Sequence, residues 1–260
     1  MQNIKITAKL NSPIGLSDDW SPDLPSLLER LWFQSSGSGE ASSDPRELRH
    51  APIPLRMRVL GENLQSIDSV EIMHPTQRSE LPDNWYWASS APCYEIISSG
   101  STQVRKRQDP NVTGCLKSRS HKWDSSTGHL KNYDLPILHR TMAEINWFAV
   151  GDADRVLALL NQCTSLGKKT AAGLGQVESW LVEEVEHDYS LLSDRQLMRP
   201  VPVAALSSDI TGYSIRNWVW RPCPKDQLMH WRELCALPTK TVIHANTQGD
   251  AVAMGAATAV

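Results

Sequence analysis

A glycine-rich segment, LLNQCTSLGKKTAAGLGQVESW, constrains the fold of this chain more than any other feature. It overlaps the end of a helical apolar pattern over residues 153–164, and strand-like alternation resumes in QVESWLVEEVE. Glycines at 167, 173 and 175 permit positive φ angles and the close approach of another stretch of backbone. The sequence therefore predicts a helix, a tight glycine-rich loop and a strand in immediate succession.

The same loop carries groups that suit phosphate binding. Its exposed amides can donate hydrogen bonds to phosphate or sugar oxygens, and two adjacent lysines add positive charge. An ordinary helix-to-strand turn with a glycine cap is the alternative. The candidate site residues are Gly167, Lys168, Lys169, Thr170, Gly173 and Gly175.

Two familiar phosphate-binding motifs do not match this loop. A Walker loop has a glycine five residues before its Gly-Lys-Ser/Thr core, but position 162 is Gln and Lys169 intervenes before Thr170. The Rossmann motif follows a strand, whereas a helix is predicted here. The sequence therefore indicates neither of these nucleotide-binding classes.

Patterning elsewhere predicts an α+β chain. A leucine-rich helical pattern over residues 22–33 has Ser21 as its candidate cap, and Gly151 and Asp152 supply a turn and a cap for the second helix. Pro92 indicates a bulge or an edge position in its strand. Apolar–polar alternation predicts strands over residues 3–10, 53–60, 68–73, 85–97 and 135–150.

The order of these elements resembles a ferredoxin-like (RRM/RAMP) βαββαβ domain with the glycine-rich loop before its last strand. Strands beyond that set predict an inserted basic β-hairpin, or thumb, and a small C-terminal β-sheet. We expect the ferredoxin-like domain over 1–186, with a flexible loop at 34–46, and a β-rich extension over 187–244. The tail, 245–260, lacks bulky core formers and is expected to be disordered.

Residues 104–134 form a basic insertion that should protrude from the sheet. The segment has a net charge of +4, counting seven Lys and Arg against three Asp. Positive charge for phosphates beside an aromatic ring for stacking suits single-stranded RNA, whereas incidental charge on a solvated loop is the alternative. The candidate RNA-binding residues here are Arg105, Lys106, Arg107, Lys117, Arg119, His121, Lys122, Trp123 and Lys131.

Composition limits the classes of function. The net charge of −3 shows that the whole chain is no general polyanion binder, so any nucleic-acid site must be a local patch. Five widely spaced cysteines argue against a disulfide framework, and neither a signal peptide nor a membrane span is expected. We therefore expect a cytoplasmic protein. Most of its ten tryptophans should pack in the core, and some should stack on bases.

The glycine-rich loop resembles that of the CRISPR RAMP superfamily. The ordered set of segments over about residues 3–238 resembles the handle-capping (Cas five-like) subunit of type IV (Csf) effector complexes. The segments are ITAKLNSPI, PDLPSLLERL, RHAPIPL, WYWASS, RKRQDPN, NWFAVGDADRVLALL and WVWRPCP.

This resemblance implies a role in a ribonucleoprotein. The subunit would bind the 5′ handle of the crRNA and contact both a repeated RAMP backbone subunit and a large subunit. It would also lie near the point where target double-stranded DNA enters. The sheet and the Trp218–Trp231 region would form protein interfaces.

Catalysis is one alternative, and we expect no enzyme activity. A metal-independent ribonuclease needs a general base and a cation near the phosphate, and His121, His129 and His139 flank the basic segment. No pattern sets a base opposite a nucleophile. A discrete product from repeat RNA incubated in EDTA would favour this crRNA endoribonuclease hypothesis.

Two further alternatives are zinc binding and a protein-interaction module unrelated to CRISPR. Cys223, His230, Cys235 and His244 lack the tight C-x-x-C spacing of a zinc knuckle, so we expect no metal and no cofactor. The position of the gene relative to a repeat array would test the interaction-module hypothesis.

Overall fold

A three-stranded antiparallel sheet in the order β7-β1-β8 forms the centre of the fold. It consists of β1 (Gln2–Leu10), β7 (Glu144–Gly151) and β8 (Val177–Glu184). β1 confirms the strand predicted over 3–10, and β8 confirms the strand predicted after the glycine-rich loop. Ile4 and Ile6 on β1 are fully buried, as alternation requires. The computed structural model describes residues 1–35, 52–64, 66–68, 84–106, 132–220 and 232–239.

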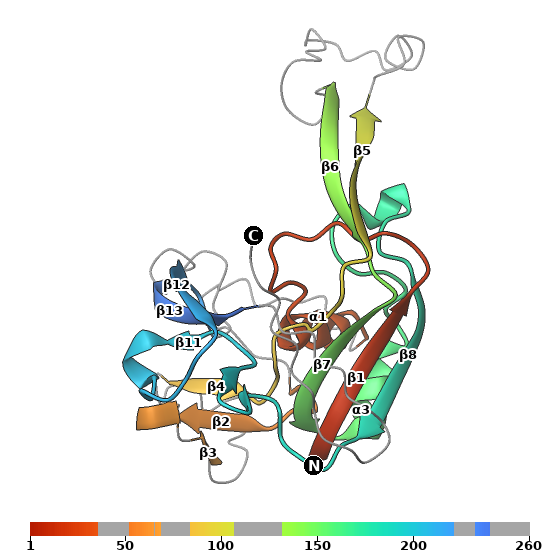
Figure 1. The fold of residues 1–260 in the computed structure, drawn as a ribbon. Coiled ribbons are helices and arrows are strands. Elements are labelled where there is room, and N and C mark those ends of the chain that lie inside the picture. Colours follow the sequence, from red (N-terminus) through yellow and green to blue (C-terminus); the bar gives the residue numbers. More distant parts are fainter. Residues whose placement is uncertain (36–51, 65, 69–83, 107–131, 221–231, 240–260) are drawn as a thin grey trace, which may run out of the picture.

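Two helices, α1 (Leu24–Ser35) and α3 (Ala153–Leu160), cover one face of this sheet (Figure 1). They bury Leu28, Val156 and Leu160 in the same core cluster as β1. The helices confirm both helical predictions to within a few residues. Within the described ranges no helix is long and apolar enough to span a membrane.

The caps of these helices are partly as predicted. Asp152 is the N-cap of α3, and its side chain accepts a hydrogen bond of 3.1 Å from the amide of Arg155. At α1 the predicted cap Ser21 is wrong. The carboxylate of Asp23 accepts from the amide of Ser26 at 3.0 Å, because the helix begins two residues later than the apolar pattern suggested.

The predicted strand over 135–150 is two strands. β6 (Tyr133–Thr141) pairs with β5 (Ser98–Lys106), whereas β7 pairs with β1. The break lies at Met142 and Ala143, between the two strands, where the chain changes partner. A period-two pattern does not show which strand lies alongside, so the break was not predictable from it.

A second small sheet has the order β3-β2-β4 and contains β2 (Met57–Leu60), β3 (Ser66–Asp68) and β4 (Trp85–Trp87). The predicted strands 53–60 and 85–97 are therefore too long. Beyond β4 the chain runs irregularly through Pro92. Its backbone pairs with β7 at the isolated bridges Ser89–Ala149 and Cys93–Asn146. Most of the predicted strand 68–73 lies outside the described residues.

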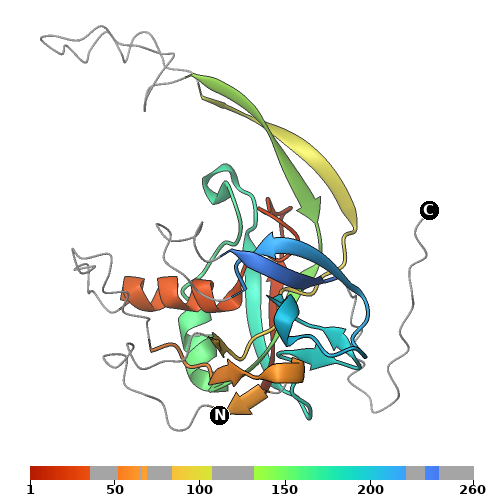
Figure 2. The same ribbon diagram turned by 90° about the vertical axis from the view of Figure 1, so that its left-hand side faces the viewer.

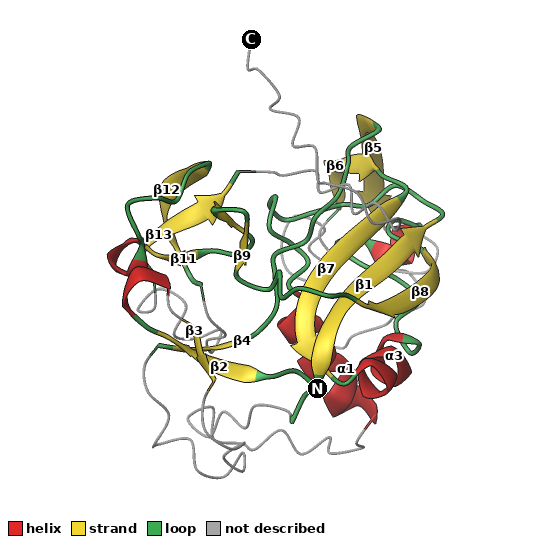
Figure 3. Ribbon diagram, turned by 60° about the horizontal axis from the view of Figure 1, so that its bottom comes forward, coloured by secondary structure: helices red, strands yellow, loops and turns green. Residues whose placement is uncertain are grey.

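The C-terminal residues form a further sheet with the order β11-β13-β12 (Figure 3). It packs on the β3-β2-β4 sheet around Tyr86, Trp220 and Val201 as a second core cluster. Its strands are β11 (Val201–Pro202), β12 (Tyr213–Trp218) and β13 (Glu233–Pro238), preceded by the short pair β9 (Leu192–Ser193) and β10 (Gln196–Leu197). Single 3₁₀ turns occur at η1 (Glu62–Leu64), η4 (Thr170–Ala172) and η5 (Val203–Ala205).

Candidate nucleic-acid interface

The glycine-rich loop is folded tightly against the segment that follows β1. Gly167, Gly173 and Gly175 all have positive φ angles, of 79°, 83° and 68°. A Cβ atom at Gly167 would lie 2.4 Å from the carbonyl oxygen of Gly15, and one at Gly175 would lie 1.9 Å from that of Leu166. Positions 167 and 175 therefore require glycine for both conformation and space.

Hydrogen bonds within the protein hold this loop in shape. The amide of Gly175 donates to the Pro13 carbonyl at 2.7 Å, and that of Gly173 donates to Thr170 at 2.9 Å. These two amides thus already have acceptors inside the chain. The glycines set the path of the loop, and the groups turned towards solvent include the exposed Lys168 and Lys169, with Thr170 half-buried beside them.

A short linking segment, Ile14–Gly15, joins the glycine-rich loop to β6. Ile14 exchanges two backbone hydrogen bonds with Arg140, of 2.8 and 2.9 Å. The next residue, Gly15, accepts one of 2.7 Å from the amide of Lys168. The loop therefore lies beside the base of the β5–β6 pair, although the two are distant in sequence (Figure 1).

The β5–β6 pair projects from the body as a long antiparallel ribbon (Figure 2). Its register runs from Ser98 opposite Thr141 to Lys106 opposite Tyr133. Both described ends of the predicted insertion, residues 104–106 and 132–134, lie on this ribbon. Arg105 lies on the outer half and pairs with Asp134 at 2.7 Å, where both side chains are exposed. A pair so open to solvent is weak and exchangeable with a phosphate.

Most of the predicted basic residues lie beyond the part of the hairpin that the structure describes. Lys106 ends β5, and its side chain is not described. The positions of the predicted loop from 36 to 46 and the tail 245–260 also lie outside the described ranges. So do the candidate residues Arg107, Lys117, Arg119, His121, Lys122, Trp123 and Lys131.

A hollow of about 320 Å³ lies at the base of the hairpin, between residues 16–18 and the start of the ribbon. The ring of His139 covers Gly100 there, where an added Cβ would lie 2.8 Å from Cε1. Its Nδ1 atom is buried and has no hydrogen-bond partner among the described residues. The sequence places His139 next to the basic segment, and its position at this hollow depends on the strand pairing.

One group at the hairpin base was missed entirely from the sequence. The Arg140 guanidinium contacts the Asp19 carboxylate at 2.6 Å and the Tyr94 hydroxyl at 3.1 Å. That hydroxyl donates to the Asp19 carbonyl at 3.1 Å, and burial raises the pKa of Tyr94 to about 12. The three residues come from distant parts of the chain, so no local pattern indicates that they meet.

Most residues of the zinc-binding hypothesis lie outside the part of the chain that the structure describes. Cys235 is buried in β13, whereas Cys223, His230 and His244 lie outside the described residues. Within the described residues no three His, Cys, Asp or Glu side chains gather as a metal site.

Comparison with known proteins shows which class this arrangement belongs to. The chain is a subunit of a CRISPR effector complex. It belongs to the family of CRISPR type IV associated protein Csf3, whose model matches residues 2–223. The match runs from β1 to just beyond Trp220, so it covers the central sheet, the hairpin and the glycine-rich loop. The hypothesis of an interaction module unrelated to CRISPR is therefore wrong.

A solved structure is also similar to this chain. It is the Csm3–Csm4 subcomplex of the type III-A CRISPR-Cas interference complex, with 10% sequence identity and a TM-score of 0.36. The similarity covers 92% of this chain and 92% of that one. No curated protein matches this chain.

Proposed function

We propose that this chain is the RNA-binding, non-catalytic subunit that binds and caps the 5′ handle of the crRNA in a type IV effector complex. The observation that carries the proposal is the linking segment Ile14–Gly15, hydrogen-bonded to Arg140 on one side and Lys168 on the other. It sets two surfaces of a kind that suits RNA, the lysine-bearing loop and the base of a projecting ribbon, next to each other.

The loop contributes charge at a fixed place. Lys168 and Lys169 are exposed at consecutive positions, and the glycine conformations at 167 and 175 hold the turn that presents them. Ammonium groups bind phosphates without reading bases, so such a loop positions an RNA backbone rather than selecting a sequence. With a net charge of −3 over the whole chain, binding must depend on this local patch and on the hairpin.

The architecture supports a ferredoxin-like domain. Each of the helices α1 and α3 follows a strand of the β8-β1-β7 sheet, and both lie on the same face of it. The segment from Ser89 to Cys93 bridges to the free edge of β7, where a fourth strand of such a domain would pair. We assign residues 1–186 to this domain and 187–244 to the C-terminal extension.

The hairpin also supports contacts with other protein subunits. Ile97 and Leu138 are 66% and 78% exposed on one face of the ribbon and its base, and Leu135 is 47% exposed on the other face. Apolar side chains gathered on a projecting element are typical of protein interaction sites. We assign this surface to the repeated backbone subunit, and we place the large subunit and the target double-stranded DNA near the same end.

The double substitution Lys168→Ala with Lys169→Ala tests the proposal. It should weaken binding of single-stranded handle RNA about tenfold, because two exposed charge contacts are lost. The slope of log affinity against log salt should become shallower by about 1.4, since each phosphate contact to a single strand contributes about 0.7. Filter binding of the purified chain at several salt concentrations measures both quantities.

Lys5→Ala with Arg155→Ala is the matched control, because it removes the same charge from the first half of β1 and from the start of α3, whereas the loop follows the other end of α3. It should leave affinity and salt slope close to those of the wild type. Wild-type RNA affinity in the Lys168/Lys169 variant would contradict the proposed function.

A further inference from the structure

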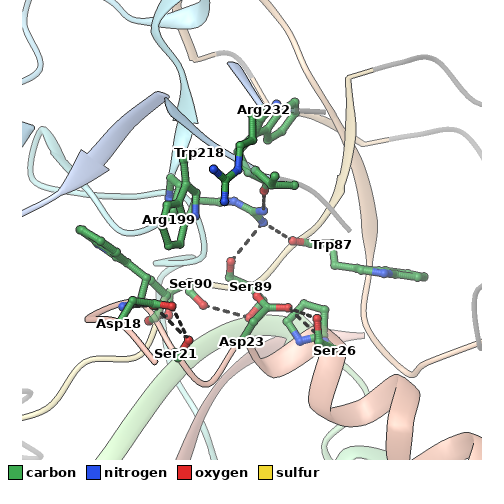
Figure 4. Close-up of a pocket in the computed structure, with 16 residues that line it drawn as sticks. Asp18, Ser21, Asp23, Ser26, Trp87, Ser89, Ser90, Arg199, Trp218 and Arg232 are labelled. Atoms are coloured by element: carbon green, nitrogen blue, oxygen red, sulfur yellow. Dashed lines mark hydrogen bonds between the residues drawn. The ribbon is translucent and has the colours of Figure 1, made fainter. Parts of the chain in front are cut away.

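A second cavity, of about 310 Å³, lies between residues 18–26 and the C-terminal sheet. Figure 4 shows Asp18, Ser21, Asp23 and Ser26 along one side of it and Arg199, Trp218 and Arg232 along the other. This volume is at the lower end of the range for small-ligand pockets, about 300–1,000 Å³. The cavity therefore suits a single flat group rather than an extended segment of protein.

Indole rings form part of the cavity wall. Trp20 and Trp218 both line it, with ring centroids 5.2 Å apart and ring planes at 63°. Both are half-buried, so part of each ring remains accessible, and the Trp20 Nε1 donates to the Pro238 carbonyl at 3.2 Å, which fixes the ring. Trp147, by contrast, is fully buried in the core. Accessible, fixed indole faces are what an unpaired nucleobase stacks on.

A buried cation also lines the cavity. Arg199 is only 7% exposed, and its Nη atoms donate to the backbone carbonyls of Trp87, Ser89 and Trp220. Its Nε has no hydrogen-bond partner among the described residues. The guanidinium is thus held in place by three carbonyls at the cavity wall, where its charge favours a polar ligand over an apolar one.

The opposite side of the cavity offers acceptors. Asp18 accepts from the Ser21 hydroxyl at 2.9 and 3.0 Å, and Asp23 accepts from the Ser26 hydroxyl at 2.7 Å, so both carboxylates are held in place. A carboxylate has about four acceptor positions, which leaves capacity for a ligand N–H.

This charge pattern selects among ligands. Two carboxylates disfavour a phosphate inside the cavity, and the buried guanidinium disfavours an apolar side chain. A nucleobase carries both amino donors and carbonyl acceptors on one edge, with flat faces for the indoles. The exposed Arg232 at the rim then suits the phosphate of the same nucleotide.

The cavity lies next to the proposed RNA path. Asp18 lines both this cavity and the hollow at the hairpin base. Gly15, which contacts the glycine-rich loop, is five residues from Trp20, so the two are at most about 18 Å apart. A single strand bound along the loop and hairpin base could therefore place one nucleotide in the cavity.

We propose that the cavity between Trp20, Trp218 and Arg199 binds one unstacked nucleobase of the single strand that this chain holds. The proposal deepens the handle-binding function and rests on it. The handle RNA and a single strand of target DNA share the required chemistry, and the experiment below separates them.

Abasic scanning tests the proposal. The probes are a single-stranded RNA that copies the 5′ end of the guide RNA recovered with the complex, copies with one abasic site at each position in turn, and DNA of the same sequence. The full-length wild type should lose about 5- to 100-fold in affinity at one abasic position and little at the others, as expected for one stacked base. The nucleic acid that shows this pattern is the source of the base.

Substitutions then assign that base to the cavity. Trp218→Leu should weaken binding of the intact probe by a similar factor and show no further loss at that abasic position. Trp218→Phe keeps a stacking ring and should retain the wild-type pattern. Trp32→Leu is the matched control, since Trp32 is a half-buried indole on α1 away from the cavity, and thermal unfolding of all variants checks that they fold.

A flat abasic scan in the wild type, or equal behaviour of Trp218→Leu and Trp32→Leu, would overturn the proposal. Normal RNA binding by Trp218→Leu with reduced recovery of the other effector subunits would also overturn it, in favour of a protein contact. A wrong handle-binding proposal would give a different result from a wrong cavity proposal. In that case the Lys168/Lys169 double variant would bind every probe as the wild type does.

Discussion

At the scale of single residues, Gly167 and Gly175 determine whether the glycine-rich loop can form. Gly175 makes the sharper demand, because a Cβ there would lie 1.9 Å from the Leu166 carbonyl oxygen. The Leu166 amide also donates to the Gly175 carbonyl at 2.8 Å, so the two residues cannot move apart without losing that hydrogen bond. Gly173 also has a positive φ angle, but an added Cβ would meet nothing within 4 Å. An alanine at 173 therefore measures the cost of the positive φ angle alone, and an alanine at 175 measures that cost together with a steric clash.

Gly175→Ala should lower the free energy of unfolding by more than about 2 kcal/mol, since a left-handed conformation and a backbone clash add together. Gly173→Ala should cost only about 1 kcal/mol, the conformational part. Urea unfolding of the two variants measures the difference. Equal losses at the two positions would show that the loop relaxes freely around Gly175.

An ion pair gives a pH-dependent prediction at the same scale. Burial raises the pKa of Asp188, but hydrogen bonds from Arg58 and Ser190 outweigh it and hold the pKa below its usual value. The carboxylate therefore stabilises the folded chain at pH values above about 3.9, where an unfolded Asp is ionised. This contribution is lost as the pH falls through the lower folded-state pKa.

Asp188→Asn should accordingly be less stable than the wild type at neutral pH, and the difference should disappear in acid. Thermal unfolding of both chains across this range of pH measures it. A difference that grows as the pH falls would mean that the pKa is raised instead.

At the scale of elements, the account depends on how the hairpin is fixed to the body. Asp19 contacts Arg140 at 2.6 Å through side chains that are 37% and 30% exposed, so the pair should contribute little to global stability. Its effect should be local, because Arg140 is also the residue that exchanges backbone hydrogen bonds with Ile14.

Asp19→Asn should therefore speed hydrogen exchange at the amides of Ile14 and Arg140 by severalfold, with little change in the unfolding midpoint. Hydrogen exchange followed by mass spectrometry on peptides from these segments measures this. The strand β1 provides an internal control, since its amides should exchange as in the wild type. Unchanged exchange at Arg140 would show that the backbone bonds alone fix the ribbon.

The elements that were predictable from sequence are those whose signal is local. Alternation in residues 3–10 and leucine spacing in α1 each depend on one face meeting a core, so the pattern is complete within a few turns. The site was only partly predictable. The loop lysines and glycines were identified, but the contacts of Ile14–Gly15 with Arg140 and Lys168 and the cluster of Asp19, Tyr94 and Arg140 arise from tertiary structure.

The hydrogen bonds of the loop illustrate the same limit at finer detail. Three glycines near two lysines suggested amides open to phosphate, yet the amides of Gly173 and Gly175 are used inside the chain. Sequence indicates where a backbone can take unusual conformations, but not which acceptor each amide finds. We therefore assign the proposed RNA contacts to the Lys168 and Lys169 side chains instead of these two amides.

At the scale of the whole molecule, an acidic chain carries a basic end. The net charge of −3 is combined with exposed lysines on the glycine-rich loop, which lies beside the base of the projecting β5–β6 ribbon (Figure 1). We expect a chain of this kind to bind a polyanion through the loop in one orientation, because a net negative charge gives phosphates little attraction elsewhere. The proposed handle-capping role requires such a fixed orientation.

The structure of the assembled effector complex, determined at a resolution that shows phosphates, tests this account most directly. The measured quantity is the distance from the Lys168 and Lys169 ammonium nitrogens to the nearest RNA phosphate oxygen. We predict contacts within about 4 Å to the 5′ handle, the limit for a charge pair. A complex in which residues 167–175 contact only protein, with the handle bound elsewhere, would contradict the account.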